Sequence, residues 1–186
     1  MKWQKDTLYY YEHGVQESFS EKAWNLLLRE MSTLSGITLI PAVSHIDSDI
    51  IIYHGAVEKY LDFIDDKTPR KLVTKYSNWS MRKWERETFA LSKASFCVDS
   101  NKMTLNSGKF YLTKNLLKTF GLLGDLEDSG SILYKGFSGP NHIFGRHEKR
   151  LLKMLYHENV LPGKKKEEIV NVFDIEYLEN LAKEKL

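Results

Sequence analysis

The sequence predicts an α+β fold, with strands concentrated in the first half of the chain and helices in the second. Two patterns lead to this prediction. The first half holds short β-branched and aromatic runs around one long amphipathic helix, and the second half repeats apolar residues at helical spacing. A length of 186 residues, with 42% hydrophobic and 28% charged residues, suits one globular domain.

The chain opens with a predicted strand and a predicted helix. Residues 7–11 are β-branched and aromatic, and Gly14 ends the run. Ser18 and Glu21 have the spacing of a capping box, which predicts the start of the helix, and Gly36 marks its end. The apolar face between them consists of Trp24, Leu27, Leu28, Met31 and Leu34.

Two strands over residues 37–43 and 49–54 follow this helix. The second is apolar at four consecutive positions, which predicts that both of its faces are covered. The aromatic-rich middle of the chain has no sustained period, and we expect a short helix over 57–64 with strands near 72–76 and 95–98.

The second half predicts a central helix and a helical end. The apolar face of the central helix stops at Gly121. Another helix, around residues 151–156, ends before the breaker at 162–163, and closing helices cover 164–173 and 175–186. We expect the whole C-terminal segment to belong to the domain, because the apolar positions around residues 151–156 and in the closing helices need a core to cover them. The apolar face of the central helix consists of Leu112, Leu116, Leu117 and Phe120.

The charge balance argues against a nucleic-acid partner. There are 27 Lys and Arg residues against 25 Asp and Glu residues, a formal net charge of +2, whereas nucleic-acid-binding domains concentrate a clear basic excess on one face. The longest apolar stretch is far shorter than the ~20 residues that span a bilayer, so we expect no transmembrane segment.

Familiar catalytic and metal-binding motifs are missing. None of the six histidines forms an i, i+4 pair, and neither a Gly-x-Ser-x-Gly nor a phosphate-binding loop occurs. The single cysteine, Cys97, lies in a predicted strand and is typical of a buried, inert thiol. We therefore expect no cofactor and no metal, and we assign no catalytic residue.

The order of the elements resembles that of matrixin-like zincins, the metallopeptidases of the metzincin group. Their central helix carries His-Glu-x-x-His-x-x-Gly-x-x-His-Asp. Here residues 114–125 read Lys-Asn-Leu-Leu-Lys-Thr-Phe-Gly-Leu-Leu-Gly-Asp. Gly121, Leu122, Leu123 and Asp125 match the family pattern.

The differences from that pattern fall at the residues that carry the chemistry. Lys114, Lys118 and Gly124 stand at the positions of the three histidine ligands, and Asn115 stands at the position of the general base. A protonated lysine has no lone pair for a metal, and asparagine does not take a proton from water at neutral pH. The resemblance therefore implies a zincin fold with a degenerate metal site.

The C-terminal half narrows the resemblance. Residues 147–157 contain a Leu-Tyr pair and precede Pro162-Gly163 and Glu167-Glu168. This order is similar to that of a bacterial matrixin-related family of unknown function, whose zinc motif is also degraded. Trp3 resembles the tryptophan that opens the domain of that family.

This resemblance implies one zincin-like domain with a mixed, twisted sheet over residues 1–186. Residues 1–125 would form its upper part of sheet and helices, and residues 126–186 its mainly helical C-terminal subdomain. Because most members of the family are exported, we expect a periplasmic or extracellular location, with an export signal already removed from the sequence as given.

The leading functional hypothesis is a non-catalytic domain that binds a protein or peptide. In zincin folds the cleft follows the edge strand above the central helix, where a peptide adds as a further strand. Lys114 and Lys118 would line the cleft floor and favour an acidic partner. Alternatively, both lysines simply project to solvent from the polar side of an amphipathic helix.

Two other functions remain open at the level of sequence. One is a metal-dependent hydrolase with relocated ligands, for example His142 and His147 with Glu148 or Asp125. The His147-Glu148 pair is also typical of a first helical turn, where a carboxylate suits the positive end of the helix dipole. The other is a structural domain of an exported assembly, with the aromatic-rich middle as its interface.

Overall fold

The computed structural model describes residues 1–123, 131–134 and 144–184, and it confirms the α+β class. A mixed five-stranded sheet has the strand order β2-β1-β3-β5-β4, in which β4 runs antiparallel to β5 and the other neighbours are parallel. The strands are β1 (Thr7–His13), β2 (Thr38–Pro41), β3 (Ile50–His54), β4 (Asn78–Trp84) and β5 (Leu91–Val98).

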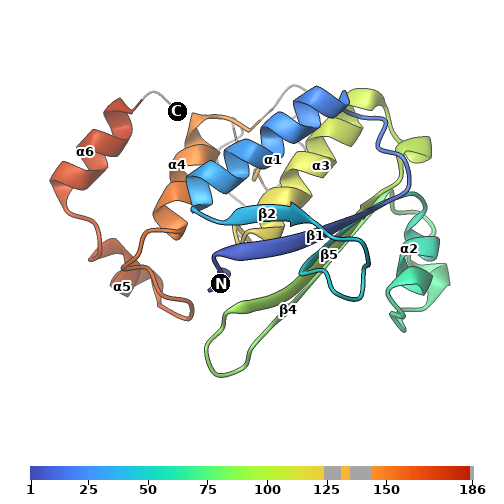
Figure 1. The fold of residues 1–186 in the computed structure, drawn as a ribbon, viewed down its shortest axis with the longest axis horizontal. Helices are drawn as coiled ribbons and strands as arrows, with labels where there is room; N and C mark the ends of the chain where they lie inside the picture. The colour runs from blue at the N-terminus through green and yellow to red at the C-terminus, as the bar shows by residue number, and fades with distance from the viewer. Residues whose placement is uncertain (124–130, 135–143, 185–186) are drawn as a thin grey trace.

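Helices cover the two faces of this sheet unequally (Figure 1). The helices α1 and α3 share one large hydrophobic core with the sheet and α4, whereas α2 packs on the opposite face in a smaller cluster. The six α-helices of the described residues are α1 (Glu21–Ser35), α2 (Val57–Phe63), α3 (Leu105–Thr119), α4 (Arg146–Leu155), α5 (Lys166–Val170) and α6 (Ile175–Lys183). None of them is long and apolar enough to cross a bilayer.

The central strand β3 confirms the expectation that both of its faces are covered. Ile50 and Ile52 belong to the main core, and Tyr53 belongs to the cluster under α2. Cys97 lies in that second cluster, fully buried, and burial raises the pKa of its thiol. The predicted inert thiol is thus confirmed as buried and held in its protonated form.

The structure corrects the start of the first helix. Ser20, not Ser18, caps α1, because its Oγ accepts from the backbone N–H of Ala23 at 3.3 Å. Ser18 is buried against α3 instead, where a Cβ added to Gly108 would lie 2.1 Å from its Oγ. Gly36 does end the helix, with a φ of 70°.

The strand predicted near residues 72–76 is also wrong. Arg70–Leu72 forms a short 3₁₀ helix, and the strand β4 begins only at Asn78. Val73 donates its backbone N–H to the carbonyl of Arg70, and its side chain is buried beside α2. A tertiary contact therefore overrides the local preference of this apolar stretch for a strand.

The N-terminal segment holds the carboxyl end of α3. Trp3 is 2% exposed, and its indole Nε1 donates to the carbonyl of Thr119 at 2.7 Å. The Tyr156 hydroxyl, from the residue after α4, donates to the carbonyl of Phe120 at 2.9 Å. Both acceptors lie at the carboxyl end of α3, in its last residue and in the capping residue after it, where no further helical turn supplies an N–H donor.

The first C-terminal helix belongs to the core, as expected. Leu152 of α4 is fully buried together with Leu116 and Leu117 of α3. The closing helix α6 is attached to α4 through polar contacts, since Arg150 donates to the carbonyl of Leu181 at 3.0 Å. It keeps apolar surface, including Ile175, exposed.

Replacement of Trp3 by Phe should lower the free energy of unfolding by about 1–3 kcal/mol, because it leaves the buried carbonyl of Thr119 without its donor. Urea unfolding followed by far-UV circular dichroism measures this. The matched control is Trp84→Phe, at a residue that is 48% exposed. Equal losses for the two variants would show that the Trp3 hydrogen bond is not what stabilises the helix end.

Candidate functional site

Three of the candidate residues from the sequence, Lys114, Asn115 and Lys118, lie close together on α3. Lys114 and Lys118 are one turn apart, and both are half-buried. The Nζ of Lys114 donates to the carbonyl of Tyr134 at 2.8 Å and lies 5.5 Å from the ring centroid of Phe110. Lys114 therefore contacts the following loop and ring rather than projecting freely to solvent.

Asn115 lies next to these lysines and is 4% exposed. Its Nδ2 has no hydrogen-bond partner among the described residues. A buried amide donor without a partner costs about 1–3 kcal/mol, so this position is unfavourable for stability. Beside this buried amide, the half-buried Lys114 and Lys118 add positive charge to the same side of α3.

Gly121 ends α3 in a conformation that favours glycine. Its φ is 98°, and a Cβ added there would lie 2.1 Å from the carbonyl oxygen of Met1. The match of Gly121 to the zincin motif thus coincides with a real backbone requirement. The other motif positions, Gly124 and Asp125, lie outside the described residues, as does His142.

The two described residues of the relocated-ligand hypothesis are not brought together. His147 is exposed in the first turn of α4, whereas Glu148 is 2% exposed. The Glu148 carboxylate accepts from the Ser131 hydroxyl at 2.5 Å and from the backbone N–H groups of Ile132 and Gly145, both at 3.0 Å. Glu148 therefore holds a loop against the start of α4.

No group of three metal-ligating side chains occurs within residues 1–123, 131–134 and 144–184. The chain matches no known protein-family model, and no curated protein is similar to it in sequence.

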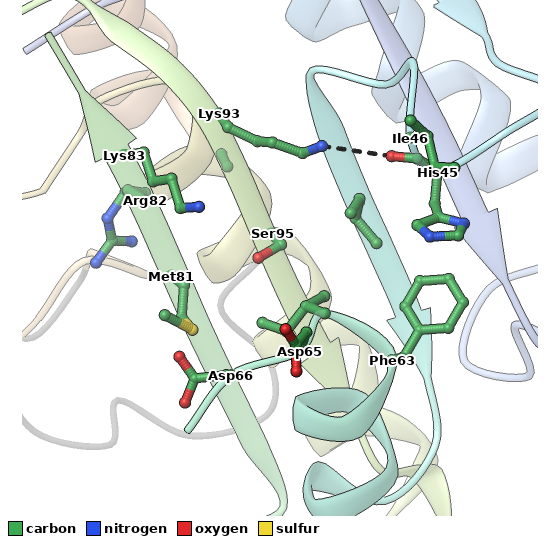
Figure 2. Close-up of a pocket in the computed structure, with 13 residues that line it drawn as sticks. His45, Ile46, Phe63, Asp65, Asp66, Met81, Arg82, Lys83, Lys93 and Ser95 are labelled. Atoms are coloured by element: carbon green, nitrogen blue, oxygen red, sulfur yellow. Dashed lines mark hydrogen bonds between the residues drawn. The ribbon is translucent and has the colours of Figure 1, made fainter. Parts of the chain in front are cut away.

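A second candidate site, which the sequence did not indicate, lies on the opposite face of the sheet (Figure 2). It is a pocket of about 390 Å³ between the end of α2, the β2–β3 loop and the strands β4 and β5. Lysines stand at one end of the pocket, acids at the other, and an aromatic wall closes one side (Figure 2). The charged and aromatic residues that line it include His45, Phe63, Asp65, Asp66, Lys83 and Lys93.

Replacement of Glu148 by Gln should lower the free energy of unfolding by about 1–3 kcal/mol. Glutamine keeps one acceptor oxygen and turns an amide donor toward N–H groups that need an acceptor. Urea unfolding measures this, with the exposed Glu158→Gln as the control. If both variants unfold at the same urea concentration, the Glu148 contacts do not hold the loop.

We expect the segment 114–124 to retain no zinc, because two ammonium groups repel a dication and give it no lone pair. Elemental analysis of the purified protein measures this directly. One tightly held zinc ion per chain that is lost on Lys114→Ala or Lys118→Ala would contradict the degenerate-site interpretation.

Proposed function

We propose that this chain is a non-catalytic binding domain that takes an extended, acidic peptide along β4. The observation that carries the proposal is the position of β4. Among the described strands it pairs on one side only, with β5, so it is an edge strand. An edge strand offers a row of backbone donors and acceptors that a peptide can use by adding as a further strand.

The side chains of β4 favour an acidic partner. Arg82 and Lys83 are consecutive on this strand, and neither forms an ion pair within the described part of the chain. Trp84 follows and is 48% exposed, and Tyr76, just before the strand, is 41% exposed. Exposed aromatic residues beside cations are typical of surfaces that bind peptides.

The polar face of α3 supports the same proposal. The helix α3 contacts both β5 and β4, so in a zincin-type arrangement β4 would be the edge strand and α3 the central helix. Lys114 and Lys118 would add positive charge near the bound peptide. With lysine and asparagine at the ligand and base positions of the zincin motif, the domain would bind a peptide without the groups that activate water for hydrolysis.

The proposal is tested with two labelled peptides of equal length and apolar content, one with Glu and the other with Lys at alternate positions. We expect the Glu peptide to bind more tightly in fluorescence anisotropy, and its binding to slow hydrogen exchange of the amides of Asn78–Trp84. Arg82→Glu should weaken binding, whereas Lys22→Glu, on exposed α1 surface, should not.

Equal binding of the two peptides would remove the charge argument. Binding without added protection of β4 would place the peptide elsewhere and would overturn the proposed mode.

A further inference from the structure

We propose that the pocket between α2 and the strands β4 and β5 binds a small organic anion. Its single carboxylate or phosphate group would lie between Lys83 and Lys93, and its aromatic or apolar body would lie against Phe63. This site shares Lys83 with the β4 edge, but its other residues lie on the α2 face of the sheet, and the inference does not depend on the peptide proposed above.

Two lysines of like charge face each other across the strands β4 and β5. Lys83 of β4 and Lys93 of β5 are directly opposite in the antiparallel register, so their side chains share one face of the sheet. Like charges at directly opposite positions destabilise a sheet. Neither lysine forms an ion pair with any described residue, and Lys93 donates to the carbonyl of His45 only at 3.4 Å.

The side chains of both lysines extend over the pocket (Figure 2). Figure 2 shows the ammonium groups of Lys83 and Lys93 over the pocket, whereas the guanidinium group of Arg82 turns away from it. An anionic group between the two lysines would supply a countercharge that no described residue provides there. Each ammonium group has three donors, and a carboxylate or phosphate oxygen accepts charge-assisted hydrogen bonds from both.

The far end of the pocket limits the charge of the ligand. Asp65 and Asp66 lie there, away from the lysines (Figure 2). Asp65 pairs with Lys67 at 2.5 Å, and Asp66 accepts from the backbone N–H of Thr68 at 2.8 Å. Hydrogen bonding to Thr68 lowers the pKa of the Asp66 carboxyl, which keeps this end negative. A ligand with anionic groups at both ends would be repelled, so one anionic end is favoured.

The middle of the pocket suits an aromatic or apolar body. The Phe63 ring is half-buried, and the His45 ring lies 4.5 Å from its centroid. Ile51 and Met81 add apolar surface around them. A pocket of about 390 Å³ lies within the size range of small-molecule sites, which combine such walls with a few polar groups that orient the ligand.

The experiment uses four probes, which are phenyl phosphate, benzoate, benzyl alcohol and inorganic phosphate, titrated into the full chain and followed by NMR chemical shifts. We expect saturable shifts at Lys83, Lys93 and Phe63 with phenyl phosphate or benzoate. The tighter binder of the two shows whether the site prefers a phosphate or a carboxylate group. Benzyl alcohol lacks the charge and inorganic phosphate lacks the body, so both should bind at least about tenfold more weakly. If neither phenyl phosphate nor benzoate gives saturable shifts, the proposal is overturned.

Two variants separate binding from stability. Lys83→Gln and Lys93→Gln should each weaken binding of the aromatic anion at least about tenfold. The same variants should raise the urea midpoint of the ligand-free protein, because they remove the cross-strand repulsion. The control is Lys59→Gln, at an exposed position of α2 outside the pocket.

A purely structural role for the lysines predicts the opposite sign of the stability change. A lower urea midpoint in both variants would therefore contradict the repulsion argument. Unchanged affinity in both variants, or an equal loss of affinity in Lys59→Gln, would place the anion outside this pocket.

Discussion

The carboxyl end of α3 is the point on which the rest of the structure depends. A helix ends with carbonyl groups that no further turn can satisfy, and here two of them are buried in the middle of the domain. Trp3, near the start of the chain, and Tyr156, directly after α4, donate to them. Burial raises the pKa of the Tyr156 hydroxyl, which keeps its proton available for this hydrogen bond.

This arrangement couples segments that are far apart in the sequence. The carbonyl of Lys2 accepts from the backbone N–H of Leu91 at 2.9 Å, so the N-terminal segment contacts β5 as well as α3. The Met1 carbonyl lies against Gly121, where a side chain would not fit. The chain before β1 is thus an internal part of the fold, and it sets the position of the helix that carries Lys114, Asn115 and Lys118.

The sequence predicted the elements whose signals are local. The apolar period of α1, the continuous apolar run of β3 and the stop at Gly121 each report burial or backbone conformation within a few residues. The prediction near residues 72–76 failed because packing under α2 decides the backbone there. The helix-start interpretation of Glu148 is confirmed, but its bonds to Ser131 and Ile132 depend on a contact between distant segments.

The register of the strands explains why the sequence does not indicate the pocket. Lys83 and Lys93 are unremarkable in sequence, and their opposition depends on the pairing of β4 with β5, which has an irregularity between Lys83 and Trp84. A shift of one residue would turn one of the lysines to the other face of the sheet. Sequence periodicity does not specify this alignment, so a charge pair across strands becomes visible only in the folded chain.

The two faces of the sheet differ in how much they contribute to stability. On one face a continuous core joins α1, the sheet, α3 and α4, and burial of large side chains such as Trp24 and Phe96 supplies most of the favourable free energy. On the other face α2 buries the sheet around Tyr53 and Cys97, and the pocket with its two opposed lysines lies beside that cluster. An unfavourable pair of charges is tolerated because the free energy gained from the main core is larger than its cost. Both proposed sites use β4 at the rim of the sheet, where cations do not disturb the core. The pocket lies on the α2 face, whereas the proposed peptide site also uses Lys114 and Lys118 of α3.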